Sequence, residues 1–406
     1  MLINQHENIY LYYINMKKKQ LLSTLVFILS TTIIHSQFNA ILNFAGISNG
    51  AEPSGTLISD GTYMYGMTRT GGSNDMGTIF KILPNGTGYV KLFDFTGTSS
   101  GSLPMGSLVS DGIDLYGMTE FGGVNNQGVI FKISVNGNGF TKLKDFSMGL
   151  YGRRPFGSLF YDGSYLYGMT WLGGTNEMGV VFKILPDGSN YTILIDFANS
   201  TIGRAPLGNL ISDGTFLYGM TTSGGIFDAG TIFKILPDGN GFIKIFDFPV
   251  GSTGYYPFGS LFFDGTFLYG MTNLEGLNNK GTIFKILPNG SGYNVLHNFG
   301  CGDDGAHPNF TTLISDGNFL YGMTSLGGIN NEGTIFKIMH NGLNYEKIFD
   351  FNSVPNGGYP DGSLIIEGNN LYGMTWIGGT NNLGTIFKYN IPQTDFNLKY
   401  CEGDII

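Results

Sequence analysis

Cysteine is almost absent from this chain, because Cys301 and Cys401 are the only two among 406 residues. A framework of several disulfides therefore cannot hold the fold, as it does in small secreted domains. In an oxidising compartment the two thiols could form one bridge, which would contribute roughly 4 kcal/mol for a loop of this length. Spacing alone does not decide between that bridge and two free thiols.

Histidine and charged residues are also scarce. Charged residues make up 13% of the chain, about half of the usual share. After residue 36 the only histidines are His297, His307 and His340, and they differ in repeat or in strand position. Neither a nucleophile motif nor metal-ligand spacing accompanies them. The sequence therefore names no catalytic residue, metal site or cofactor, and it favours a non-enzymatic protein.

Positive charge is in the minority. The whole chain has a formal net charge of −9. Residues 1–36 hold three of its 21 basic residues and one of its 30 acidic residues, so the remainder carries a net charge of −11. Such a charge makes nucleic acid and anionic membrane surfaces poor partners.

A long apolar run is missing as well. The longest, at residues 21–34, is too short for the usual membrane span. It follows three lysines at residues 17–19, as in a secretory leader. We therefore predict a signal peptide over residues 16–36, cleaved after Ser36, with residues 1–15 belonging to an over-extended start. The expected product is a soluble secreted protein without a membrane span, located in the periplasm, outside the cell or on its surface.

Glycine, by contrast, is abundant, at 65 of 406 residues, and its recurrence is ordered. The tetrapeptide Tyr-Gly-Met-Thr occurs seven times, at intervals of 51 residues with a single interval of 52. The copies begin at Tyr65, Tyr116, Tyr167, Tyr218, Tyr269, Tyr321 and Tyr372. A period of this size indicates a propeller or a solenoid, in which each unit buries its apolar faces against its neighbours.

Each unit reads as four short antiparallel strands. In the first unit we expect strand a at residues 56–59, strand b at 63–68, strand c at 77–83 and strand d at 89–95, with Asp-Gly, diglycine and Pro-Asn-Gly turn signals between them. No glycine-free window shows the 3.6-residue period of a helix. Four strands in about 51 residues match one blade. We therefore predict an all-β, seven-bladed β-propeller over residues 37–389.

The two ends of the predicted propeller favour a closed ring. The seventh unit has no strand d of its own, since only a tail of residues 390–406 follows its strand c. Residues 38–44, FNAILNF, match the strand d sequence FIKIFDF at residues 242–248. We predict that this N-terminal strand completes the last blade, which would hide two sheet edges that otherwise promote aggregation.

The repeated pattern LYGMT-x-x-GG-x-N-x-x-GTIFKI-x-PNG-x-GY resembles the tandem repeat of the GloVer family, named for Gloeobacter and Verrucomicrobia. The resemblance spans residues 38–389. It implies a secreted or surface-exposed bacterial repeat protein, often followed by a C-terminal anchoring or sorting segment. Only 17 residues follow Tyr389, so we expect no complete sorting domain. The family carries no assigned chemistry, and a likeness to kelch-type propellers is architectural.

Residues that recur in every unit serve the shared scaffold. We expect the methionine of each Tyr-Gly-Met-Thr to fill space between blades rather than to bind a metal. We expect the lysine of strand c, such as Lys81, to pair with the acid near the end of strand d, such as Asp94. An acid or amide after each diglycine could bind calcium, but turn formation is the favoured role. This last set is Asp75, Asn126, Glu177, Asp228, Asn279, Asn331 and Asn382.

Variable positions indicate where a ligand could bind. In a blade, the b–c loops and the d–a connections share one face, and the connections differ among units, as at residues 96–105, 147–156 and 249–258. Recognition is usually placed on such variable loops. Aromatic rings interleaved with arginine around the channel mouth suit sugar stacking or a protein hot spot. We nominate Trp171, Trp376, Arg69, Arg154, Tyr256 and Tyr359 as ligand-binding residues, with mere coverage of loop backbone as the open alternative.

The sequence therefore favours a non-catalytic binding or scaffold module, monomeric, that recognises a glycan or a cell-surface or extracellular protein. One alternative is a glycan-active hydrolase or lyase, with Glu177 or Asp228 beside Arg153, Arg154 and Arg204 at the channel mouth. Another is a structural spacer without a specific ligand.

Overall fold

The computed structural model describes residues 37–392, apart from residues 199, 252, 301 and 302. The predicted leader, nearly all of the predicted tail and both cysteines lie outside the described residues. Within the described part, no helix is long and apolar enough to cross a membrane.

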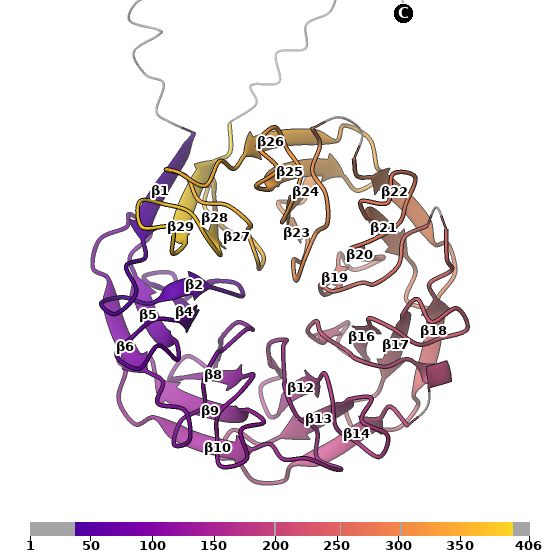
Figure 1. Ribbon diagram of the computed structural model, residues 1–406. Coiled ribbons are helices and arrows are strands. Elements are labelled where there is room, and N and C mark those ends of the chain that lie inside the picture. Colours follow the sequence, from indigo (N-terminus) through magenta and orange to yellow (C-terminus); the bar gives the residue numbers. More distant parts are fainter. Residues whose placement is uncertain (1–36, 199, 252, 301–302, 393–406) are drawn as a thin grey trace, which may run out of the picture.

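Seven small antiparallel sheets surround a central axis, which confirms the predicted seven-bladed propeller (Figure 1). The innermost strands, a, are β3 (Ile58–Ser59), β7 (Val109–Ser110), β11 (Phe160–Tyr161), β15 (Ile211–Ser212), β19 (Phe262–Phe263), β23 (Ile314–Ser315) and β27 (Ile365–Glu367). Strands b are β4 (Met64–Thr70), β8 (Asp114–Thr119), β12 (Leu166–Thr170), β16 (Leu217–Thr221), β20 (Leu268–Thr272), β24 (Phe319–Thr324) and β28 (Asn370–Thr375).

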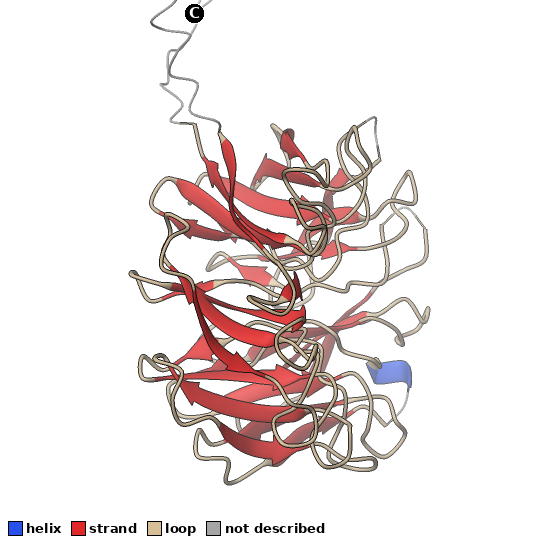
Figure 2. Ribbon diagram, turned by 60° about the vertical axis from the view of Figure 1, so that its left-hand side comes forward, coloured by secondary structure: helices blue, strands red, loops and turns tan. Residues whose placement is uncertain are grey.

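The outer two strands of each blade follow the same order. Strands c are β5 (Thr78–Ile82), β9 (Val129–Ser134), β13 (Val180–Ile184), β17 (Thr231–Ile235), β21 (Thr282–Ile286), β25 (Thr334–Met339) and β29 (Thr385–Asn390). Strands d are β6 (Val90–Asp94), β10 (Thr141–Asp145), β14 (Thr192–Asp196), β18 (Ile243–Asp247), β22 (Asn294–Asn298), β26 (Glu346–Asp350) and β1 (Phe38–Asn43). The short strand β2 (Ala51–Pro53) and the 3-10 turn η1 (Ser200–Ile202) lie in d–a connections, and Figure 2 shows η1 among the loops of one face.

The N-terminal strand closes the ring as predicted. Strand β1 pairs antiparallel with β29, with Phe38 opposite Tyr389 and Leu42 opposite Ile386, and Figure 1 shows the two strands side by side. The ring of Phe38 stacks on Phe349 of the sixth blade at 3.9 Å between centroids. The first described strand therefore belongs to the last blade, so the two ends of the propeller are held together.

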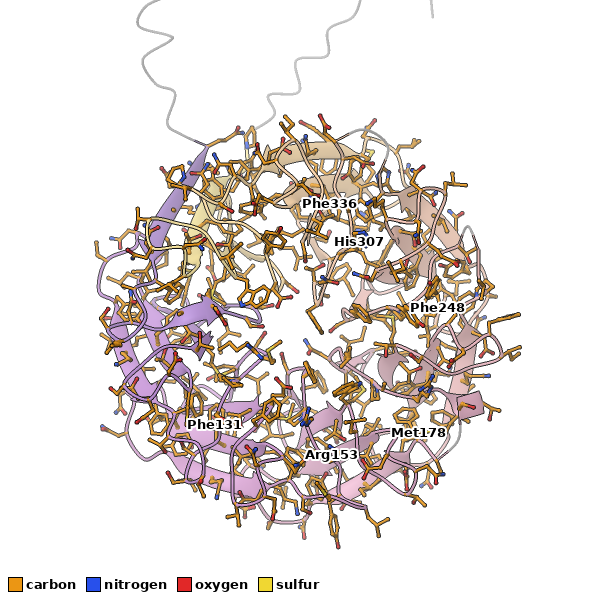
Figure 3. The ribbon with its side chains drawn as sticks, in the orientation of Figure 1. Phe131, Arg153, Met178, Phe248, His307 and Phe336 are labelled. Carbon is orange, nitrogen blue, oxygen red and sulfur yellow. The ribbon has the colours of Figure 1, made fainter. Side chains whose placement is uncertain are left out.

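The core consists of seven apolar clusters, one between each pair of adjacent blades. Between the second and third blades, Met118 and Phe146 pack with Leu166 and Phe182, all nearly inaccessible to solvent. Phenylalanines such as Phe131, Phe248 and Phe336 lie between the hole and the rim of the ring (Figure 3). The repeated methionines therefore fill space between blades, as expected.

The expected pairing between strand c lysines and strand d acids is wrong. Lys81 reaches the next blade, where its Nζ donates to the carbonyl of Val135 at 3.3 Å and lies over the ring of Tyr63. Asp94 pairs instead with Lys91, three residues earlier in the same strand, at 2.9 Å. In four blades strand d supplies its own cation for this acid, and in four blades the lysine of strand c donates to a carbonyl of the next blade. Lys337 does pair with strand d of its own blade, but with Glu346 at the start of the strand.

The acid or amide after each diglycine forms a turn, as favoured from the sequence. In every blade its side-chain oxygen accepts the N–H of the residue four positions earlier. Each of these residues also has a positive φ, a conformation that Asn and Asp tolerate better than most residues. Among the described residues, no cluster of acid, histidine or cysteine side chains is placed to hold a metal ion.

Candidate functional site

The channel mouth is built from the d–a connections and the residues that follow strands b. Before each blade, the residue that precedes the proline of the connection adopts a positive φ between 51° and 57°. Its carbonyl accepts the N–H of the residue after strand b, as in the bond from Trp376 to Tyr359 at 3.1 Å. This hydrogen bond joins the backbones of the two residues, so that their variable side chains start from neighbouring positions at the mouth.

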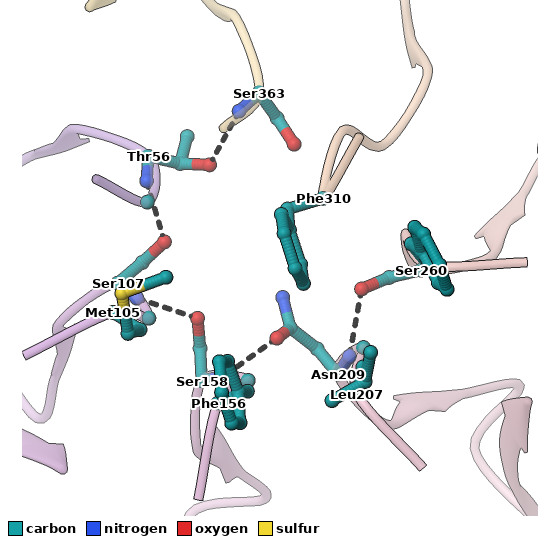
Figure 4. Close-up of a pocket in the computed structure, with 15 residues that line it drawn as sticks. Thr56, Met105, Ser107, Phe156, Ser158, Leu207, Asn209, Ser260, Phe310 and Ser363 are labelled. Carbon is teal, nitrogen blue, oxygen red and sulfur yellow. Dashed lines mark hydrogen bonds between the residues drawn. The ribbon is translucent and has the colours of Figure 1, made fainter. Parts of the chain in front are cut away.

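Below the mouth the channel is closed by the chain segments that precede strands a. The backbone N–H of Thr56 donates to Ser107, Ser107 to Ser158 and Asn209 to Ser260, each at 2.7 Å to the side chain of the next blade (Figure 4). A glycine lies just before each of these residues. The free space at this level is about 30 Å³, room for only a few water molecules.

The sixth blade departs from this pattern, although Thr312 still donates to Ser363 of the seventh blade at 2.7 Å. Its segment reads Pro-Asn-Phe-Thr-Thr where the other blades have Pro-x-Gly followed by Ser, Thr or Asn, and the extra residue accounts for the single interval of 52. Phe310 has a φ of +49° and projects toward the middle of the ring (Figure 4). Its ring stacks against Phe156 at 6.3 Å and Phe258 at 6.0 Å. The insertion therefore adds an aromatic plug to the floor of the mouth.

Above this floor lies a hollow of about 320 Å³, called here the mouth pocket. Its wall combines aromatic and other apolar side chains with three charged ones. The lining residues are Arg69, Met105, Glu120, Phe156, Asn309, Phe310, Ser325, Tyr359, Asp361 and Trp376. Trp376 is 37% exposed, so part of its ring is open to a ligand. The size falls at the lower end of ligand pockets, ~300–1,000 Å³.

The charges of the mouth pocket are largely compensated. The guanidinium of Arg69 lies 3.7 Å from the carboxylate of Glu52 and 3.9 Å from that of Glu120. Burial raises the pKa of Glu120, against the opposing charges of Arg69 and Arg154. The guanidinium of Arg154 lies over the ring of Phe121, 4.4 Å from its centroid. These contacts hold both arginines in place, and the charge of Arg69 is compensated by its two acidic partners.

Asp361 is the most strongly perturbed acid in the mouth pocket. Burial raises its pKa to about 7, while the charge of Arg69 and the hydroxyl of Ser54 act in the opposite direction. Near neutral pH the carboxyl therefore exists in both protonation states. It can donate a hydrogen bond as an acid or accept one as a carboxylate, which suits an amphiphilic ligand with many hydroxyls.

The nominated residues divide between neighbouring hollows. Arg69, Tyr359 and Trp376 line the mouth pocket. Trp171 and Tyr256 line a second hollow of the same mouth. Arg154 is not among the lining residues of either hollow, and its charge partly opposes the rise that burial causes in the pKa of Glu120.

Sequence reasoning included the residues after the prolines in the variable connections but nominated none of them for binding. The position directly after the proline holds Ser54, Met105, Phe156 and Asp361 in the first, second, third and seventh blades. In the sixth blade Phe310 follows it by one residue. A comparison of this position among the seven units would have shown that only the seventh has an acid there, Asp361. The interval of 52 residues marked the insertion at Phe310. These residues were not nominated because the sequence analysis chose the residues just before the prolines and just after the Tyr-Gly-Met-Thr runs.

The carboxylates suggested for the hydrolase alternative have structural partners. Glu177 pairs with Arg153 at 2.9 Å, and Asp228 pairs with Arg204 at 2.9 Å. Both acids also accept a backbone N–H of their own b–c loops. Neither lines the mouth pocket, whose acids are Glu120 and Asp361.

Comparison with known families gives one match. The family described as the Gloeobacter/Verrucomicrobia repeat matches residues 24–170, 148–309 and 263–401. A search of curated proteins gives no match.

Several solved structures share the propeller architecture. An oligogalacturonate lyase from Vibrio parahaemolyticus is 13% identical, with a TM-score of 0.56 over 88% of this chain and 94% of that chain. The extracellular domain of a putative one-component system from B. thetaiotaomicron is 15% identical, with a TM-score of 0.57 over 87% of this chain and 40% of that chain. A putative 6-phosphogluconolactonase from Bacteroides uniformis is 15% identical, with a TM-score of 0.50 over 76% and 86%. Identities this low show the fold alone.

Proposed function

The chain belongs to the Gloeobacter/Verrucomicrobia repeat family, and from that premise we propose that it is a secreted, monomeric binding propeller that takes a neutral glycan at its channel mouth. The observation that carries this proposal is the mouth pocket, which joins Trp376 and Tyr359 to the polar groups of Glu120 and Asp361. Aromatic rings suit the apolar faces of sugars, and acid and amide groups suit their hydroxyls.

The charge of the site favours a neutral ligand over an acidic one. Two arginines of the mouth are paired with acids: Arg69 with Glu52 and Glu120, and Arg204 with Asp228. The guanidinium of Arg154 instead lies over the ring of Phe121. A sugar carboxylate would have to compete with these acids for the guanidinium groups. The net negative charge of the chain opposes a polyanion further.

The size of the pocket favours a sugar over a protein surface. A hollow of about 320 Å³ above a closed floor holds a small group in a concave site. A protein interface commonly needs about 800 Å² of surface from each partner. A sugar unit of a cell-surface glycan would fit a pocket of this size. Such a glycan would also be found in the extracellular location that the family implies.

The test is a glycan array, followed by calorimetric titration with neutral gluco-, manno- and xylo-oligosaccharides of one to five units and with oligogalacturonates as the anionic comparison. We expect one neutral series to bind and Trp376→Ala to weaken it about tenfold, since an aromatic contact contributes about 1.4 kcal/mol. Ile113→Ala, a change at an exposed residue of the a–b hairpin in the second blade, is the control. Binding that Trp376→Ala leaves unchanged would overturn the proposal.

A second candidate function is acid–base cleavage of the bound glycan. It is favoured by the two acids of the mouth pocket whose pKa values burial raises, Glu120 and Asp361. An acid that is protonated near neutral pH can protonate a leaving group. Turnover of the bound oligosaccharide that Asp361→Asn abolishes without abolishing binding would establish this activity, whereas an intact ligand after long incubation would exclude it.

A further inference from the structure

A second hollow opens beside the mouth pocket, in the same channel mouth. It has a volume of about 370 Å³. The side chains that line it come from the third, fourth and fifth blades and the connections before them. They include Phe156, Trp171, Arg204, Leu207, Tyr256 and Phe258. Phe156 also lines the mouth pocket, so the two spaces adjoin at this aromatic side chain.

The aromatic rings of the second hollow hold one another in place. Trp171 meets Phe156 edge to face at 5.4 Å between centroids. Tyr256 lies nearly parallel to Phe258 at 6.3 Å, and Phe258 in turn packs on the Phe310 plug at 6.0 Å. Rings fixed in this way offer a binding surface that loses little side-chain freedom when a ligand arrives.

The second hollow differs from the mouth pocket in its polar groups. Its lining residues, all in the described part of the chain, include no acid. Its cation, Arg204, donates to both carboxylate oxygens of Asp228, at 2.9 and 3.0 Å. The second hollow is therefore a neutral aromatic surface, suited to contact with the face of a sugar ring more than to selection among hydroxyl patterns.

A ligand that leaves the mouth pocket has few directions in which to continue. Downward, the ring of hydrogen bonds and the Phe310 plug leave about 30 Å³ in the channel. A sugar chain cannot pass through that space. A sideways path over Phe156 reaches the second hollow, where Trp171 and Tyr256 provide the next contacts.

We propose that the channel mouth contains two adjacent sugar subsites, the mouth pocket and the second hollow, and that the ligand is a neutral oligosaccharide of at least two units lying across Phe156. This inference rests on the proposed function. The unit in the mouth pocket meets Trp376, Glu120 and Asp361, and the following unit meets Trp171.

The test compares chain lengths, with the neutral oligosaccharide series that binds best, from one to five units, titrated into the wild type, Trp171→Ala and Trp376→Ala. We expect the wild type to bind the disaccharide at least tenfold more tightly than the monosaccharide. Trp171→Ala should remove most of that gain and weaken monosaccharide binding far less than Trp376→Ala does. Trp376→Ala should weaken every length by a similar factor. Thermal unfolding of each variant, with Trp171→Phe as the conservative change, checks that the fold persists.

The possible failures are distinct. Absence of binding by the wild type, or indifference to Trp376→Ala, would remove the proposed function and the subsites with it. If Trp376→Ala lost binding but the wild type bound one sugar unit as tightly as several, the second subsite alone would be overturned. The same conclusion would follow if Trp171→Ala bound every length as tightly as the wild type does.

Discussion

At the scale of the residue, Asp361 shows how a buried acid of the proposed site can weaken the fold that carries it. Its folded-state pKa is about 7, against a reference value of 3.8, and the cause is burial. The folded protein therefore binds more protons than the unfolded chain between these two pH values. Stability is fully present below about pH 4 and falls as the pH rises through 7.

Replacement of Asp361 by Asn should remove this dependence. We expect Asp361→Asn to raise the free energy of unfolding at pH 8 by roughly 1–2 kcal/mol, less than the full linkage value because the carboxyl is partly exposed in the pocket. At pH 4 the variant and the wild type should match. Thermal unfolding at the two pH values checks this.

Asp187 provides the control for that measurement. It lies in an exposed c–d hairpin, where hydrogen bonds from Ser189 lower its pKa. Asp187→Asn should give no gain at pH 8, since a lowered pKa contributes stability at high pH rather than removing it. A gain at pH 8 equal to that of Asp361→Asn would mean that the effect is not specific to the mouth pocket.

At the scale of the element, the segments before strands a explain why the channel is closed. A side chain on Gly157 would place its Cβ 2.2 Å from the carbonyl oxygen of Gly208 in the next blade. Backbone therefore meets backbone around the channel, and only glycine allows this approach. The Phe310 segment of the sixth blade departs from the pattern and supplies the plug.

Gly157→Ala should destabilise the protein by about 3 kcal/mol, because the neighbouring carbonyl belongs to a hydrogen-bonded ring and cannot move alone. Gly163→Ala is the control. A Cβ there meets nothing within 4 Å, although the φ of +95° carries its own strain, so we expect a loss of about 1 kcal/mol. Chemical denaturation of both variants measures the difference. Equal losses would show that the ring does not depend on close backbone contact.

The elements themselves were largely predictable, because their signals are local and repeated seven times. Strands b and c lie where the Tyr-Gly-Met-Thr and Thr-Ile-Phe-Lys-Ile runs place them. The strand a that we expected at residues 56–59 is shorter and covers only Ile58–Ser59. Thr56 instead makes its backbone hydrogen bond to Ser107 of the next blade, a contact 51 residues away that strand propensity does not reveal.

At the scale of the whole molecule, the closure of the ring could be predicted from the sequence, whereas the candidate site could be predicted only in part. The pairing of β1 with β29, called here the clasp, could be predicted because the seventh unit lacks a strand d and the N-terminal segment matches one. The mouth pocket depends on which blades come together around the channel. Arg69 and Trp376 lie 307 positions apart in sequence, yet they line the same hollow because the seventh blade is next to the first.

Closure can be tested by removing the clasp. Deletion of residues 38–44 should expose the edge of β29 and remove the ring contact of Phe38 with Phe349, and the protein should then associate and unfold at a lower temperature. Light scattering after size-exclusion chromatography reports the association. A synthetic peptide of residues 37–44 should restore the monomer. A deletion variant as stable and monomeric as the parent would argue against the clasp.

The most direct measurement of the central claim is a crystal structure of the protein with its tightest-binding neutral oligosaccharide. The account predicts one sugar unit in the mouth pocket, against Trp376 and within hydrogen-bond distance of Asp361. It would be contradicted by a sugar bound elsewhere, for example on the a–b and c–d hairpins or along the exposed apolar residues of the b–c loops, such as Ile226 and Leu277, with the mouth pocket empty.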